Sequence, residues 1–180
     1  MKDVMEVKRM DPYVKLARNT IDLYIREGKV YQPEDEELTC EMRTARAGAF
    51  VSIHENGGLR GCIGTIAPTR ESVAEEIVSN AIAASTCDPR FQAIRKDELE
   101  SLEISVDVLS PAEQISSPDE LDVKRYGVIV EKDFRRGLLL PNLDGVDTID
   151  YQIEIALRKA GIGLNETGVQ LYRFEVVRHI

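Results

Sequence analysis

Two alternating segments joined by a turn signal constrain the fold of this chain more than any other feature. Residues 48–54 and 59–65 alternate between apolar and other side chains, and Glu55-Asn56-Gly57-Gly58 lies between them. Asn-Gly between two alternating segments is typical of a β-hairpin. A hairpin that alternates in this way buries one face in an antiparallel sheet and leaves the other to polar groups.

The register of this hairpin depends on the length of its turn, because a shift of one residue exchanges the two faces. A two-residue turn, Asn56-Gly57, places Ile53 opposite Arg60 and Val51 opposite Cys62. In this register the Cys62 thiol lies beside aliphatic groups, as a small buried hydrophobe.

A three-residue loop, with Gly58 in the left-handed region, gives the other register. It places His54 opposite Arg60 and Ser52 opposite Cys62. This register separates the faces better, because the apolar residues of both segments then share one side. We therefore favour this register. It gathers Ser52, His54, Arg60 and Cys62 into one polar cluster.

The second segment places a thiol two residues after a guanidinium and between two glycines. Residues two apart on a strand face the same side, so Arg60 is expected beside Cys62. A nearby cation favours the thiolate, which is the nucleophilic form of cysteine. Gly61 and Gly64 carry no side chains, which lets another group approach the sulfur. The pattern indicates a reactive or ligand-binding thiol, with His54 as a candidate base.

The same residues also fit a packing role. Free cysteine is among the most buried residue types and usually fills space. In this interpretation Arg60 is a hydrogen-bonding strut and His54 is a solvated residue near a hairpin tip. A Cys62 exposed in a concave polar pocket would favour the reactive thiol, whereas enclosure by Val, Ile and Leu would favour packing.

Charge and composition exclude several classes of protein. The 180 residues carry a net charge of −9, which opposes general attraction to nucleic acid. No apolar run reaches the roughly 18 residues needed to span a bilayer. Three cysteines without CxxC spacing and two histidines predict no disulfide framework and no metal site, and no cofactor is predicted. We expect a reducing, cytoplasmic setting.

Helices are expected in three places, each marked by its cap or its terminal glycine. The first begins at Asp11-Pro12 and ends at Gly28. The second has Thr69 as its cap. The third is capped by Asp147 and ends at Gly161.

Further strands are predicted where apolar residues alternate or form short runs, at 102–109, 126–131, 137–140 and 169–177. Helices and hairpins are interspersed, without regular strand–helix–strand repeats. The predicted fold class is therefore α+β, with a largely antiparallel sheet flanked by helices. The acidic connector 31–37 and the segment 110–122 are expected to be loops.

Four segments, taken together, resemble the AMMECR domain family. Leu59-Arg60-Gly61-Cys62-Ile63-Gly64 resembles the hallmark motif of that family, and three further segments match it in order, at 88–91, 102–110 and 126–141. A six-residue motif containing cysteine, followed by ordered matches, is specific. The resemblance covers roughly Asp11 to the C-terminus, so we expect one domain over residues 1–180 with a tail at 1–10.

The resemblance implies an α+β fold with a larger and a smaller lobe forming a cleft, and it places the hallmark motif in the cleft region. It implies no particular reaction. Relatives are found beside, or fused to, a Memo-type protein and beside a radical-SAM protein. That association suggests a shared pathway and leaves the chemistry open.

Two functions from different classes follow. The first is a cleft enzyme or ligand-binding protein for a small-molecule substrate, centred on Cys62. Its predicted site comprises Cys62 and His54 as catalytic groups and Arg60, Gly61, Gly64, Asp88 and Arg90 as substrate-binding groups. The second is a non-catalytic binding or assembly module that docks a Memo-type or radical-SAM partner. RNA binding fits the acidic chain less well, and no membrane contact is expected.

Overall fold

The computed structural model describes residues 10–180, which form eight strands, four α-helices and three short 3-10 helices. The described chain divides into two compact units. The larger runs to Asp107 and is rejoined by Arg178–Ile180, and the smaller is Val108–Val177. The predicted α+β class is confirmed. The predicted tail at 1–10 lies outside the described residues except for Met10, and the predicted cleft stays a prediction.

Helix α1, Pro12–Glu27, begins and ends where the sequence predicts. The Asp11 side chain accepts hydrogen bonds from the backbone amides of Tyr13 and Val14, which caps the first turn. Gly28 follows the helix in the left-handed region, with φ of 70°. The local signals at both ends were therefore sufficient to define this helix.

Helix α3, Val73–Thr86, begins later than predicted, because Ser72 and not Thr69 is its cap. Thr69 instead donates from its amide and its hydroxyl to the Glu76 carboxylate. The sequence also did not predict the five-residue helix α2, Cys40–Thr44, or the 3-10 helix Asp35–Glu37 in the connector expected to be a loop. Both are too short to show a helical period.

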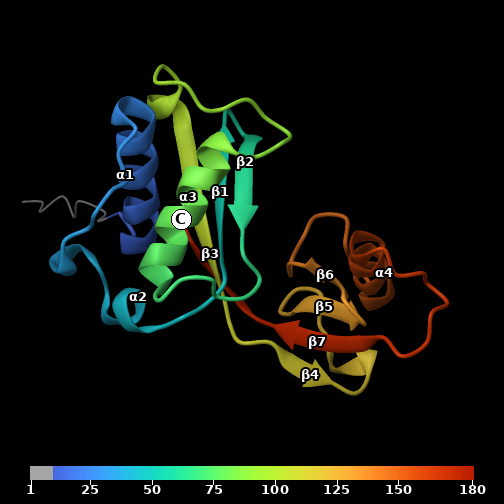
Figure 1. Cartoon of the computed structure of the whole chain (residues 1–180). Coiled ribbons are helices and arrows are strands. Elements are labelled where there is room, and N and C mark those ends of the chain that lie inside the picture. The colour runs from blue at the N-terminus through green and yellow to red at the C-terminus, as the bar shows by residue number, and fades with distance from the viewer. Residues whose placement is uncertain (1–9) are drawn as a thin grey trace, which may run out of the picture. The chain divides into compact units, whose positions relative to one another are not determined.

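The first sheet has the strand order β2-β1-β3-β8. Its strands are β1, Ala49–Glu55; β2, Gly58–Gly64; β3, Leu102–Leu109; and β8, Val176–His179. Helices α1 and α3 lie side by side, and α3 packs against β1 and β2 (Figure 1). The core between them is fully enclosed, with Val51, Ile53, Ile77, Ala81 and Val106 at 0% exposure.

The β1–β2 hairpin combines features of both expected registers. Its turn is the two-residue Asn56-Gly57, with both φ angles positive. His54 therefore pairs with Leu59, and the expected pairing of His54 with Arg60 is wrong. The register then shifts, so that Ser52 pairs with Cys62 as favoured.

The shift is a β-bulge at Arg60. Ile53 pairs with Gly61 and the preceding β1–β2 pair is His54 with Leu59, so Arg60 is the extra residue on β2. The expected left-handed Gly58 is wrong for the same reason, since the bulge supplies the one-residue offset that a longer loop would have given. Alternation alone does not distinguish these two solutions.

The second unit holds a sheet with the order β4-β7-β5-β6. Its strands are β4, Glu113–Ile115; β5, Gly127–Lys132; β6, Arg135–Leu139; and β7, Gln170–Phe174. Helix α4, Ile149–Ala160, is capped by Thr148 and not by Asp147, and Gly161 ends it as predicted. The predicted strand 169–177 is two strands, β7 and β8, which belong to different sheets.

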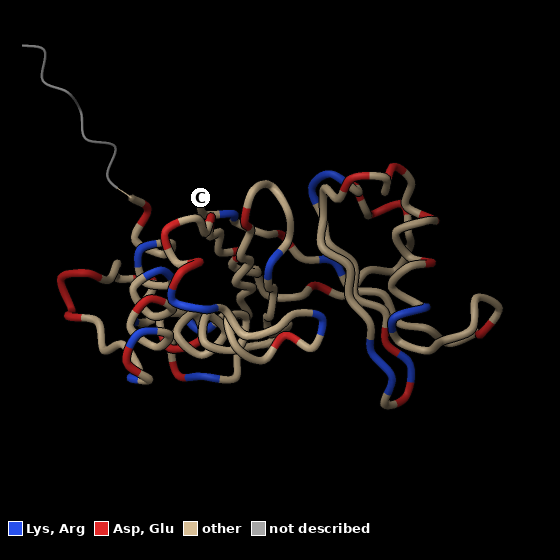
Figure 2. The backbone as a smooth tube through the Cα atoms, turned by 90° about the horizontal axis from the view of Figure 1, so that it is seen from above, with Lys and Arg blue, Asp and Glu red and all other residues tan. Residues whose placement is uncertain are grey.

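Positions of Lys and Arg are interspersed with positions of Asp and Glu along the described backbone (Figure 2). Among residues 10–180, no helix combines the length and the apolar character that crossing a bilayer requires.

Candidate functional site

Cys62 lies on the face of the first sheet that points away from α3. The neighbouring Gly61 points toward α3, where an added Cβ would overlap the Ala84 carbonyl oxygen, and side chains alternate along a strand. The thiol is half-buried, and its Sγ lies 3.2 Å from Ser52 Oγ. A hydroxyl, and not an aliphatic wall, is therefore the cross-strand neighbour of this thiol.

Asp88 and Arg90 hold the backbone of Cys62. The Cys62 amide donates to Asp88 Oδ2 at 2.9 Å, and the Arg90 guanidinium donates to the Cys62 carbonyl at 3.3 Å. The two side chains also form an ion pair with each other, with Arg90 Nη2 2.8 Å from Asp88 Oδ2. Because β2 is at the edge of its sheet, these side chains occupy the position of a neighbouring strand.

The pKa of the buried Asp88 carboxyl is held well below its usual range. The main cause is hydrogen bonding from Arg90, and the amides of Cys62 and Arg90 add to it, while burial opposes it. Asp88 is thus a fixed anion, and its charge is matched by Arg90.

Arg60 binds a carboxylate of its own. Its Nε and Nη2 donate to the two carboxylate oxygens of Glu98, at 2.8 and 3.2 Å. The guanidinium also donates to the carbonyls of Gln92 and Ala93. The hydrogen bonds from Arg60 are the main cause of a lowered pKa of Glu98, and the Arg95 amide adds to them. Arg60 therefore braces the segment after α3, which is the strut role that the sequence left open.

Two other arginines, Arg90 and Arg178, lie within electrostatic range of Cys62. Arg178 of β8 donates to both oxygens of the buried Asp107, each at 2.8 Å. The pKa of Arg178 is raised first by these bonds, and Cys62 contributes in the same direction. Cys62 has the same small effect on the pKa of Arg90, where Asp88 is the main cause.

Sequence reasoning missed Arg178, because no motif around Cys62 points to it. It lies at the far end of the chain, and only the pairing of β8 in the first sheet brings it to this unit. Asp107 offered no distinct signal, because Glu103 and Ser105 occupy the same alternating polar positions of that strand.

His54 stands apart from this network. It is half-buried and, by alternation along β1, shares the face of Ser52. Among the hydrogen bonds of residues 10–180, none joins the His54 imidazole to Cys62, Ser52 or Asp88. Its predicted role as a base therefore stays a prediction.

The two glycines flanking Cys62 have packing partners. A Cβ at Gly61 would overlap the carbonyl oxygen of Ala84 in α3, and a Cβ at Gly64 would overlap the Phe50 ring. The space that each glycine leaves on its own side is thus filled by the protein, and their predicted binding role stays a prediction. Among the described residues, no group of three or more His, Cys, Asp and Glu is placed to hold a metal ion.

Comparisons with known proteins agree with this fold and motif. The family model AMMECR1 matches residues 14–179. A protein of Thermotoga maritima is 52% identical over 169 residues, which cover 93% of this chain and 97% of that protein. A Clostridium acetobutylicum protein is 48% identical over 99% of this chain, but the chain spans only 38% of its length.

A solved structure shares the fold. The crystal structure of the uncharacterized protein PH0010 from Pyrococcus horikoshii matches with a TM-score of 0.84 and 29% identity. The match covers 92% of this chain and 88% of that chain. These similarities extend over both compact units and are not limited to the hallmark motif.

Proposed function

This chain belongs to the AMMECR1 family, and we propose that Cys62 is the reacting group of a small-molecule site on the polar face of its first sheet. One observation carries the proposal. The half-buried Cys62 thiol has a hydroxyl as its cross-strand neighbour, and the Arg90 guanidinium donates a hydrogen bond to the Cys62 carbonyl. A thiol held among polar groups and cations is suited to nucleophilic chemistry.

The surrounding residues have distinct roles in this proposal. Asp88 and Arg90 are positioning residues, because they fix the backbone of Cys62. Arg178 is the residue suited to hold an anionic substrate group, since its side chain is 57% exposed although it is paired with Asp107. Arg60 is given no part in binding here, because its side chain is only 17% exposed and is held by Glu98.

The test is alkylation of Cys62 at neutral pH in a variant with Cys40 and Cys87, both exposed, replaced by serine. Neutral iodoacetamide and anionic iodoacetate are compared. We expect labelling of the native protein, and Arg178→Gln is expected to slow iodoacetate about two- to fivefold more than iodoacetamide. The matched control is Arg95→Gln, which removes an exposed arginine paired with Asp97 and is expected to change neither rate.

Labelling that appears only after denaturation would contradict the proposal. If Arg178→Gln slows both reagents equally, Arg178 does not bind the anion. The proposal that the Cys62 thiol is reactive would still stand.

A second function, a non-catalytic assembly module, has its own supporting observation. Arg60, Gly61, Gly64, Asp88 and Arg90 all have packing or bracing partners within the chain. In this case the hallmark motif maintains the fold, and another surface docks a Memo-type or radical-SAM partner. Titration calorimetry with such a partner from the same genome tests it, with Cys62→Ala expected to leave the affinity unchanged.

A further inference from the structure

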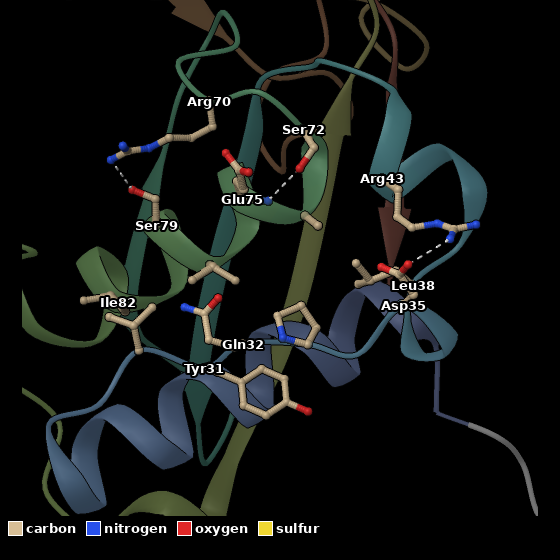
Figure 3. A pocket seen from close by; sticks show the side chains of 14 residues that line it. Tyr31, Gln32, Asp35, Leu38, Arg43, Arg70, Ser72, Glu75, Ser79 and Ile82 are labelled. Atoms are coloured by element: carbon tan, nitrogen blue, oxygen red, sulfur yellow. Dashed lines mark hydrogen bonds and ion pairs between the residues drawn. The ribbon is translucent and has the colours of Figure 1, made fainter.

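A cavity of about 680 Å³ lies in the first unit, between helix α3 and the segment 30–38 (Figure 3). Its volume is in the range of small-molecule sites. Leu38 lines one wall, and Val78 and Ile82 of α3 line the other, so both walls are partly apolar. Two guanidiniums, from Arg43 and Arg70, are on its rim.

The wall formed by the connector is held rigidly. Tyr31 donates its hydroxyl proton to Glu37 at 2.7 Å, and Lys15 of α1 donates to the other oxygen of Glu37 at 2.8 Å. Asn19 of α1 donates to the Tyr31 oxygen. The hydrogen bonds, first that from Lys15, lower the pKa of Glu37 to about 2. This acidic connector is thus held against α1, and contacts within the chain fix this wall of the cavity.

The opposite rim is fixed by a buried carboxylate. Glu76 of α3 is 0% exposed and accepts hydrogen bonds from the Thr65 hydroxyl, from the amide and hydroxyl of Thr69, and from the Arg70 amide. Burial acts to raise the pKa of Glu76, but these bonds together outweigh it and lower the pKa. The hydrogen bond to Glu76 therefore anchors the Arg70 backbone at the cavity rim.

Among residues 10–180, the Arg70 guanidinium has no carboxylate partner within ion-pair distance. Among the hydrogen bonds of residues 10–180 it makes one, from Nη2 to the neutral Ser79 hydroxyl at 3.0 Å. Arg43, by contrast, has Asp35 at 3.8 Å. Glu75 also lines the cavity, so the net charge of the rim is small. A singly charged anion suits this rim better than a doubly charged one.

We propose that this cavity binds a small amphipathic monocarboxylate. Arg70 and Ser79 hold the carboxylate, since a guanidinium presents paired donors that match two carboxylate oxygens. The apolar body of the ligand lies against Leu38, Val78 and Ile82. The site is independent of Cys62, and the two proposals are tested by different variants.

The test compares two probes of nearly the same shape, the anion 2-naphthoate and the neutral 2-naphthamide, by titration calorimetry with the whole chain. We expect 2-naphthoate to bind about tenfold more tightly than the amide. Arg70→Gln is expected to abolish this difference and leave the affinity for the amide unchanged. The matched control Arg95→Gln should retain it, and Ile82→Ser should weaken both probes.

Three outcomes would overturn the proposal. They are no binding of 2-naphthoate at millimolar concentration, equal affinity for the two probes in the unmodified protein, and the same loss in Arg95→Gln as in Arg70→Gln. Arg70 is exposed, so its replacement is expected to leave the melting temperature unchanged, and a melting curve of each variant excludes unfolding as the cause.

Discussion

The two hairpins, β1–β2 and β5–β6, solve the same packing problem and differ in what they add to it. In each, a strand glycine lies directly under a helix. A Cβ at Gly61 would overlap the Ala84 carbonyl oxygen of α3, and a Cβ at Gly137 would overlap the Ala156 carbonyl oxygen of α4. Gly61 of the hallmark motif therefore has a packing role in this fold.

The difference between the hairpins is the bulge and the residue after it. The β5–β6 register is regular, from Val128 opposite Leu139 to Lys132 opposite Arg135. The β1–β2 register shifts at Arg60 and then pairs Cys62 with Ser52. Bulges that redirect side chains often occur beside functional sites. The comparison teaches that function should be sought in Cys62 and its polar neighbours, and not in the glycines.

The largest expected effect tests the shared feature. Gly61→Ala and Gly137→Ala should each lower the free energy of unfolding by about 3 kcal/mol, because the added methyl group meets helix backbone. Urea unfolding of both variants measures this. A much smaller effect at one glycine would show that the two hairpins do not depend equally on this close contact with a helix.

The next effect tests the edge of β2. Asp88→Asn should lower the free energy of unfolding by about 2 kcal/mol, because Arg90 loses its charged partner and the Cys62 amide loses a strong acceptor. The control in the other hairpin is Glu131→Gln, which removes the ion pair with Arg136. This variant should change the free energy of unfolding by less than about 0.5 kcal/mol. Equal effects would show that the edge bracing is unimportant.

The same carboxylate predicts a pH dependence. The pKa of Asp88 is lowered in the folded protein, so its contribution to stability is fully present above the unfolded value of about 3.9 and is lost as the pH falls through the folded value. Urea midpoints measured from neutral to acidic pH should therefore fall less steeply in Asp88→Asn. Identical slopes in both proteins would contradict the assignment.

The smallest effects concern the two turns. Gly57 has φ of 78°, so Gly57→Ala should lower the free energy of unfolding by about 1 kcal/mol. Phe134, at the β5–β6 turn, is 94% exposed, so Phe134→Ser should change the free energy of unfolding by less than about 0.5 kcal/mol. Thermal melts compare the pair. A large loss in Phe134→Ser would reveal a contact of this ring that stabilises the fold.

Local signals predicted the elements whose ends are set by neighbouring residues. Asp11 and Gly28 defined α1, and Gly161 ended α4, because capping depends on a few adjacent backbone groups. The start of α3 was misplaced because Thr69, a good cap by composition, donates to Glu76 of the helix itself. A buried acceptor seven residues away is not visible in a local pattern.

The sequence by itself determined the α+β class, most strand positions, the hallmark motif around Cys62 and the adjacent pair of Asp88 and Arg90. Only the tertiary structure decided which charges meet. The fold pairs Arg60 with Glu98 and places Arg178 in the first sheet. The physical reason is that capping and alternation act between neighbours in sequence, whereas the partner of a long charged side chain depends on strand order and on one-residue shifts such as the bulge at Arg60.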